Sequence, residues 1–199
     1  MQRGHAAALA PMIEATLASA GVRAQDLGLI AVTVGPGSFT GVRIGLATAR
    51  GLALALGVPL AGLTTIETLL AAATAADRQL LQAQHRRLLA ALDTHRGDYY
   101  VGFDDAPAPR LADANLIVAQ ADGALLIIGD GAPSLCAALV QSGIDAQPAD
   151  GPATPDATVL ASMALQRGAD HWRTANGRDG MPAPLYLRPA DVTLPRGGR

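Results

Sequence analysis

The chain has 199 residues, a formal net charge of −2, and 50% hydrophobic but only 16% charged residues. This length and composition predict a folded protein with a buried core and exclude a largely disordered chain. The low net charge argues against broad, direct binding of nucleic acid. All 15 basic residues are arginine. Functions that require a lysine, such as a P-loop ATPase or a Schiff-base enzyme, are therefore excluded.

The single cysteine, Cys136, cannot form an internal disulfide, which indicates a reducing, cytoplasmic compartment. No run of about 18 apolar residues lacks charges or helix breakers, so no membrane-spanning helix is predicted. The first 20 residues resemble a signal peptide in composition. His5, Pro11 and Glu14 interrupt the apolar stretch that such a peptide needs, and a helix of the folded protein is the better interpretation.

The first half of the chain alternates helices and strands, which is typical of an α/β layer. Glu67 can complete a capping box if Thr64 is the N-cap of its helix. Apolar spacing and turn residues predict, in chain order, a helix over 5–20, a strand over 29–34, a helix over 40–56 closed by Gly57, a strand over 58–62 and a helix from 64 or 65 to 76.

The second half is predicted to form a separate unit. A polar segment over 77–86 joins the halves, giving a first lobe over 1–80 and a second lobe over 81–199. The predicted elements are strands over 88–92 and 99–103 around a turn at 93–98, further strands over 116–118 and 125–128, helices over 133–142 and 157–168, and an irregular tail from 173.

Gly35, Gly37 and Gly41 form a G-x-G-x-x-x-G loop between a predicted strand and a predicted helix. Backbone amides in such a loop can hold an anion. A dinucleotide-binding oxidoreductase using the Gly35–Gly41 loop is therefore one alternative. It would need an acidic residue at the end of the next strand, and that place reads Ala-Gly-Leu-Thr.

The helix after the loop carries small residues every four positions, at Gly41, Gly45, Ala49 and Ala53. A four-residue ridge of small side chains allows another element to approach closely. Two glycines in a helix each cost roughly 1 kcal/mol relative to alanine, so close packing is the natural compensation. The ridge fits packing within one domain and packing against another subunit equally well.

The run Gly-Pro-Gly-Ser-Phe-Thr-Gly-Val-Arg-Ile-Gly at 35–45 resembles the signature of the TsaB family of bacterial tRNA threonylcarbamoyladenosine biosynthesis proteins. Residues 3–5, 57–60, 93–99 and 184–189 resemble further family segments in the same order. The resemblance implies an α/β, actin-like, two-lobed fold of the sugar kinase, Hsp70 and actin superfamily. Family members begin with additional strands, so we expect a first lobe that is N-terminally truncated and a longer upstream reading frame.

The same resemblance implies a noncatalytic subunit that pairs with TsaD, a catalytic paralogue that transfers a threonylcarbamoyl group to the adenosine beside the tRNA anticodon. An ATPase, TsaE, is an expected further partner. A homodimer is possible in isolation, tRNA contact is expected only through the complex, and no cofactor is expected. Family dimers form through the helices that correspond to 5–20 and 40–56. The predicted partner-interface residues are Met12, Thr16, Gly41, Arg43, Gly45, Thr48 and Ala49.

No catalytic or metal-ligating residue is predicted. TsaD holds a metal through two histidines four residues apart, and the matching positions here are Thr65 and Leu69. Leucine cannot coordinate a cation. A glycopeptidase-like hydrolase is the second alternative, because relatives of this superfamily branch have carried that label. Neither a nucleophile–base pair nor a metal pair in the sequence supports it.

Overall fold

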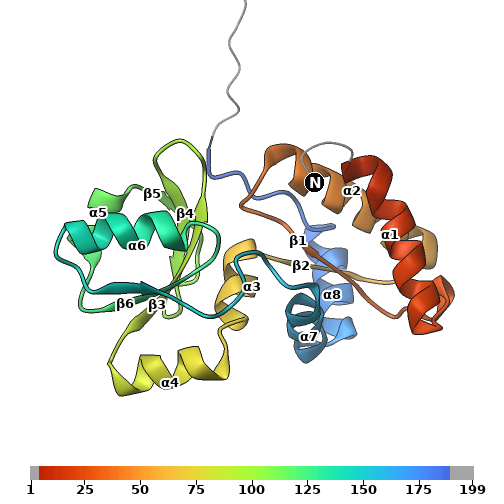
Figure 1. The fold of residues 1–199 in the computed structure, drawn as a ribbon. Coiled ribbons are helices and arrows are strands. Elements are labelled where there is room, and N and C mark those ends of the chain that lie inside the picture. Colours follow the sequence, from red (N-terminus) through yellow and green to blue (C-terminus); the bar gives the residue numbers. More distant parts are fainter. Residues whose placement is uncertain (1–4, 189–199) are drawn as a thin grey trace, which may run out of the picture.

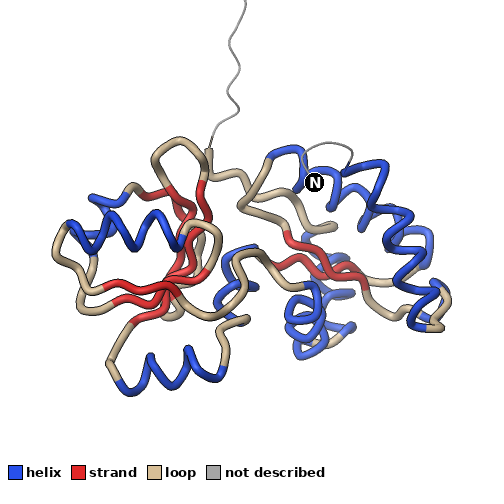
Figure 2. Tube along the Cα trace, viewed as in Figure 1, coloured by secondary structure: helices blue, strands red, loops and turns tan. Residues whose placement is uncertain are grey.

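The computed structural model describes residues 5–188, so the family segments over 3–5 and 184–189 are described only in part. The chain forms two α/β halves side by side (Figure 1). One contains a two-stranded sheet of order β1-β2, and the other a five-stranded sheet of order β5-β4-β3-β6-β7. Figure 2 shows helices packed around both sheets. This arrangement confirms the predicted α/β class.

The strands and helices are numbered in chain order. The strands are β1 (Ile30–Thr33), β2 (Leu60–Leu63), β3 (Arg87–Asp93), β4 (Tyr99–Phe103), β5 (Arg110–Ala112), β6 (Leu125–Ile128) and β7 (Ala146–Pro148). The helices are α1 (His5–Ala20), α2 (Phe39–Leu56), α3 (Thr65–Ala71), α4 (Ala75–Ala83), α5 (Ala114–Gln120), α6 (Ala132–Gln141), α7 (Ala157–Arg167) and α8 (Ala169–Asp179), with a short 3-10 turn at Ala24–Asp26.

The small sheet is parallel and is covered by helices on both faces. β1, α2 and β2 form a βαβ unit in which Ile30 pairs with Leu60. Ala49 and Ala53 of α2 are buried with Val32 of β1 on one face. The opposite face packs on α7 and α8 in a cluster with Leu160, Ala164 and Trp172. Both faces of a parallel sheet are normally buried in this way, which explains the apolar character of its strands.

Residues 157–179 lie with the small sheet, which departs from the predicted division at residue 80. The side-chain amide of Asn176 in α8 accepts from the Leu60 amide (2.8 Å) and donates to the Leu60 carbonyl (3.1 Å). These bonds satisfy backbone groups on the outer edge of β2. Sequence order could not reveal this return of the chain, because the contact joins residues 116 positions apart.

The large sheet confirms the predicted hairpin. β3 and β4 are antiparallel, with Asp93 opposite Tyr99 across the turn at 94–98. β6 adds in parallel to β3, and β7 to β6. One face carries a core with Ile117 of α5 and Leu135 of α6, and the other packs on α3 and α4.

Three predicted elements are wrong in detail. The predicted strand over 116–118 is the helix α5, capped by the Asp113 side chain on the Leu116 amide and buried only through Ile117. The tail is helical to Asp179, and Trp172 anchors that helix with an indole bond to the Ala164 carbonyl. The predicted helix to 76 breaks into α3 and α4 because Thr74 starts a second capping box.

Within the described residues, α2 has the length and mean hydropathy (1.2 over 18 residues) that would allow a membrane span by composition alone. In this fold, however, α2 packs on the small sheet. Leu46, Ala49 and Ala53 are buried against the sheet. Arg43 and Arg50 are both held by the C-terminal segment, since Arg43 bonds Tyr186 and Arg50 bonds the Pro182 carbonyl.

Asp77 provides a test of the fold, because its buried carboxylate joins α4 to the loop after β7. It accepts from the Thr74 amide (2.7 Å) and hydroxyl (2.9 Å) and from the Asp150 amide (2.8 Å). Burial opposes ionisation, but these hydrogen bonds outweigh it and hold the pKa of Asp77 below its usual value. The stabilisation is therefore present above the unfolded pKa, near 3.9, and is lost as the pH falls through the folded pKa.

We predict that Asp77→Asn lowers the free energy of unfolding at pH 7 by about 1–3 kcal/mol, because an amide group would face backbone donors. The wild type should lose more stability than the variant between pH 5 and pH 3. Urea unfolding at both pH values measures this. The exposed Asp122→Asn is the matched control. Equal stabilities of the two variants at pH 7 would contradict the stabilising role given to the Asp77 carboxylate.

Candidate functional site: a surface on α1 and α2

The predicted ridge on α2 faces inward. Ala49 is 6% and Ala53 1% exposed, both in the core beneath the helix. A β-carbon built on Gly45 would lie 3.9 Å from a Val32 methyl, so this glycine also faces β1. Gly41 lies over Ser38, whose side chain caps the helix by accepting from the Gly41 amide (3.1 Å). Of the two glycines, Gly45 therefore faces the sheet, whereas Gly41 adjoins the cap residue Ser38.

The outward face of α2 is a different stripe of residues. Phe39, Arg43, Ala47, Gly51 and Leu54 are all exposed, and Leu54 is 76% exposed. They recur at three- and four-residue spacing, as one face of a helix does. A β-carbon at Gly51 would touch nothing within 4 Å. We call these five residues the outer stripe. Of the predicted interface residues on α2, Arg43 is the one that belongs to it, and Thr48 is half-buried.

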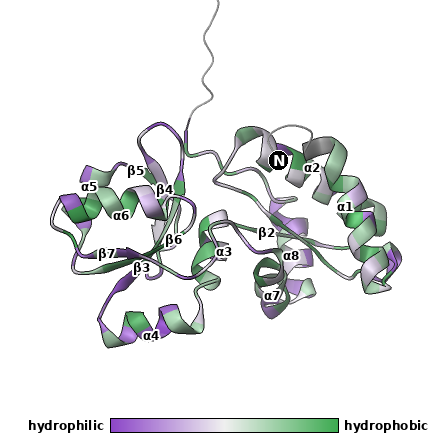
Figure 3. Ribbon diagram, viewed as in Figure 1, coloured by the Kyte–Doolittle hydropathy of each residue, from purple (hydrophilic) through white to green (hydrophobic). Residues whose placement is uncertain are grey.

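α1 packs beside α2, and in Figure 3 it takes mostly apolar and near-neutral colours. Met12 is 53% exposed, and Thr16 is exposed with its hydroxyl donating to the Met12 carbonyl (2.7 Å). Glu14 is the acidic residue of this 16-residue helix. Depletion of charge together with an exposed Met side chain is typical of the central part of a protein–protein interface. The exposed residues of α1 and the outer stripe form the candidate partner surface.

Residues 181–188, which we call the strap, cross from α2 to the large sheet. The Leu185 amide donates to the Val34 carbonyl (2.8 Å), and Arg50 donates to the Pro182 carbonyl (2.6 Å). At the far end Arg188 pairs with Asp98 in the β3–β4 turn. The strap therefore holds the two halves together on one side. Glu67 of α3 and Arg167 of α7 (3.2 Å) make another connection between elements of the two halves.

A cavity of about 960 Å³ lies between the halves. Its walls come from β1 and the start of α2, from the β3–β4 turn, and from the strap. The lining includes Thr33, Ser38, Phe39, Thr65, Asp93, His95, Asp130, Tyr186 and Arg188. The sequence indicated the Gly35–Gly41 loop and the 93–98 turn separately. It did not indicate that they face one another, because the contact depends on the fold of both halves.

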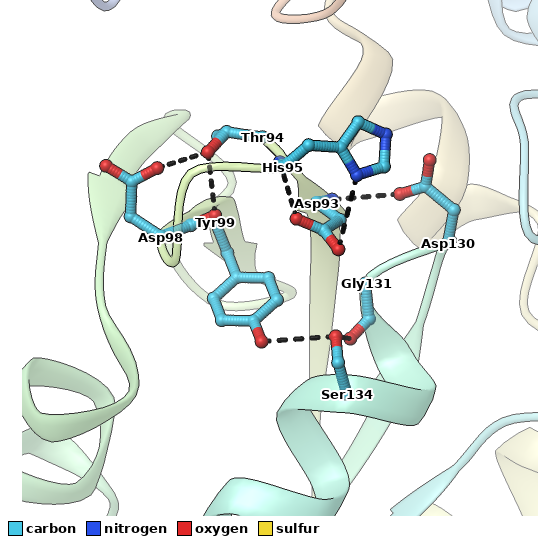
Figure 4. Close-up of polar contacts among 8 residues, drawn as sticks. All are labelled: Asp93, Thr94, His95, Asp98, Tyr99, Asp130, Gly131 and Ser134. Atoms are coloured by element: carbon cyan, nitrogen blue, oxygen red, sulfur yellow. Dashed lines mark hydrogen bonds and ion pairs between the residues drawn. The ribbon is translucent and has the colours of Figure 1, made fainter.

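The β3–β4 turn is fixed by its own polar side chains (Figure 4). Asp93 accepts from the His95 amide (2.7 Å), and the Asp93 amide donates to Asp130 (3.0 Å). His95 occupies the left-handed region at φ 58°, which the Asp93 bond to its amide supports. Thr94 bonds both the carbonyl (3.0 Å) and the side chain of Asp98. These contacts make a rigid turn at the cavity wall.

The carboxylate of Asp98 is stabilised in its ionised form by its neighbours in this turn and the strap. The Thr94 hydroxyl, with help from the Arg188 guanidinium, holds the pKa of Asp98 below its usual range. The Ser134 hydroxyl accepts from the Tyr99 hydroxyl (3.1 Å) and donates to the Gly131 carbonyl (3.3 Å), so these bonds join β4 to the start of α6. Burial raises the pKa of the Cys136 thiol to about 11, so it is a poor nucleophile. Over residues 5–188, no group of three or more His, Cys, Asp or Glu side chains could hold a metal ion.

Residues 1–113 match the protein family described as TsaD, tRNA N6-adenosine threonylcarbamoyltransferase. The chain is 37% identical over 98 residues to the tRNA threonylcarbamoyladenosine biosynthesis protein TsaB of Escherichia coli, which covers 49% of this chain and 40% of that protein. It is 45% identical over 78 residues to the tRNA N6-adenosine threonylcarbamoyltransferase of Erythrobacter litoralis, covering 39% and 23% of the two chains.

Solved structures extend the likeness to nearly the whole chain. A Pseudomonas aeruginosa protein described as similar to the peptidase YeaZ matches with a TM-score of 0.68 and 26% identity, over 94% of this chain and 86% of that one. YeaZ of the same organism matches with a TM-score of 0.64 and 25% identity, over 92% and 85%. The alignments with the curated relatives span less than half of those proteins.

These matches define an α/β protein with the actin-like fold of threonylcarbamoyladenosine biosynthesis proteins. The chain belongs to the TsaD family, and within it the resemblance to TsaB, predicted from residues 35–45, is confirmed.

The inward orientation of the small-residue ridge is testable with two matched substitutions. We predict that Ala53→Leu lowers the free energy of unfolding by about 1–3 kcal/mol, because added methyl groups would crowd the core between α2 and the sheet. Ala47→Leu, on the outer stripe, should change it by less than about 0.5 kcal/mol. Chemical denaturation of both variants measures the difference. Similar stabilities would show that α2 is rotated from this orientation.

Proposed function

We propose that this protein is a noncatalytic subunit that pairs with a TsaD-type transferase for threonylcarbamoylation of the adenosine next to the anticodon of tRNA. The resemblance to TsaB carries the proposal. The α1–α2 surface supports it, since two adjacent helices expose large apolar side chains with little charge around them. Exposed apolar side chains gathered on adjacent helices are a common mark of an interaction site.

The environment of two residues supports a noncatalytic role. Thr65 lies at the cavity wall, where its amide donates to the Gly35 carbonyl (2.8 Å). Leu69 is fully buried in the core between α3 and the large sheet, with Leu88 and Leu92. These two positions match the metal ligands of TsaD in the family resemblance. A buried leucine in that place offers no donor atom, so the chemistry of the reaction belongs to the partner.

The wider assembly follows from the same proposal. A TsaE-type ATPase joins the pair, and a homodimer forms through the same surface when the partner is absent. The tRNA is bound through the complex, in keeping with the net charge of −2. The protein acts in the cytoplasm, where tRNA is modified. The hydrolase and dinucleotide alternatives are not favoured by the curated relatives, which are named for threonylcarbamoyladenosine formation.

Size-exclusion chromatography with light scattering tests the pairing. We predict a one-to-one complex when this chain is mixed with the TsaD-type paralogue of the same genome. Threonylcarbamoyladenosine formation on a tRNA transcript should require both proteins together with the TsaE-type ATPase. The matched control is the paralogue with the ATPase and without this chain, which should form little product. A folded chain that elutes separately from its paralogue and leaves product formation unchanged would refute the proposal.

A further inference from the structure

Phe39, Arg43 and Tyr186 form an exposed cluster where α2 meets the strap, and we call it the aromatic shelf. The chain has only six aromatic residues, two Phe, three Tyr and one Trp. Phe39 is 48% and Tyr186 44% exposed, whereas Phe103, Tyr99 and Trp172 are buried. The two most exposed aromatic rings of a chain that is poor in aromatics therefore lie together, with ring centroids 5.3 Å apart.

Arg43 holds the two rings in place. Its Nε donates to the Tyr186 hydroxyl (2.6 Å), and its guanidinium lies 3.8 Å from the centre of the Phe39 ring. The strap that carries Tyr186 is itself fixed one residue earlier by the bond from Leu185 to Val34. Side chains that are already ordered lose less conformational entropy when they bind. The shelf is thus a preorganised surface.

The charge of Arg43 is not neutralised within residues 5–188. Its contacts are the Tyr186 hydroxyl and the two aromatic rings, and no carboxylate pairs with it. By contrast, Arg86, Arg87 and Arg188 each pair with an aspartate. Nε of Arg43 is engaged, so its two terminal amino groups remain to bind the two oxygens of a carboxylate.

We propose that the aromatic shelf docks the TsaD-type partner by taking a carboxylate on Arg43 and an adjoining apolar side chain on Phe39 and Tyr186. This inference rests on the proposed function and extends the partner surface from the helices α1 and α2 onto the C-terminal strap. Arginine and tyrosine are enriched among the residues that dominate protein–protein binding energy, and the shelf combines both with a phenylalanine. The outer stripe leads from the shelf along α2 to Leu54.

Binding of the purified paralogue, measured by calorimetry, tests the shelf. Phe39→Ala and Arg43→Gln should each weaken binding, raising the dissociation constant about 10- to 30-fold. Arg43→Lys should fall between Arg43→Gln and the wild type, because it keeps the charge without the planar fork. The affinity of Arg43→Gln should also depend less on salt than that of the wild type. Circular dichroism melting establishes that each variant is folded.

Leu165→Ala is the matched control. Leu165 is 67% exposed on α7, which covers the opposite face of the small sheet from α2, so this variant should bind as the wild type does. If the wild type fails to bind the paralogue, the proposed function is wrong. If the wild type binds and the folded shelf variants bind equally well, the shelf is not part of the interface, while the pairing itself stands.

Discussion

Helix α2 packs closely on the small parallel sheet, and this contact decides which of its residues face outward. Gly45, Ala49 and Ala53 let the helix lie directly over Val32 and Leu60. At the buried Ala49 and Ala53, larger side chains would push the helix away from β1. With α2 fixed by this contact, its opposite face has to point outward, and Arg43 and Leu54 are on that face.

The same packing explains how a C-terminal segment comes to complete the surface near the start of α2. Arg50 on the flank of the helix holds the Pro182 carbonyl, and Val34 at the end of β1 holds the Leu185 amide. The strap then reaches the β3–β4 turn, where Arg188 meets Asp98. The cavity wall, the aromatic shelf and the contact between the halves thus share one short segment.

Local signals in the sequence predicted much of the fold. The helix end at Gly57, Thr64 as an N-cap with Glu67 in its capping box, and the hairpin around 93–98 are confirmed, because each depends on neighbours within a few residues. The strand expected over 116–118 and the irregular tail from 173 were wrong. Both segments carry weak local patterns. Tertiary contacts fix their helices: Ile117 of α5 lies in the core, and Trp172 of α8 donates to the Ala164 carbonyl of α7.

The site was less predictable than the fold. Small residues at four-residue spacing indicated a tightly packed helix face but could not indicate what packs there, and the structure places the sheet against it. The outer stripe gave no comparable signal, since Ala47 and Gly51 occur in an alanine-rich helix without any distinctive pattern. Tyr186 joins Arg43 across 143 positions of sequence, and such a contact can be found only once both halves are folded.

Hydrogen–deuterium exchange of this chain, alone and with the TsaD-type paralogue, locates the surface that the partner covers. Pairing through the α1–α2 surface and the strap predicts slower exchange in α1, in α2 and in residues 181–188, with α5 and α6 unchanged. Protection confined to α5, α6 or the outer face of the large sheet would contradict it and would place the partner surface on the other half of the molecule.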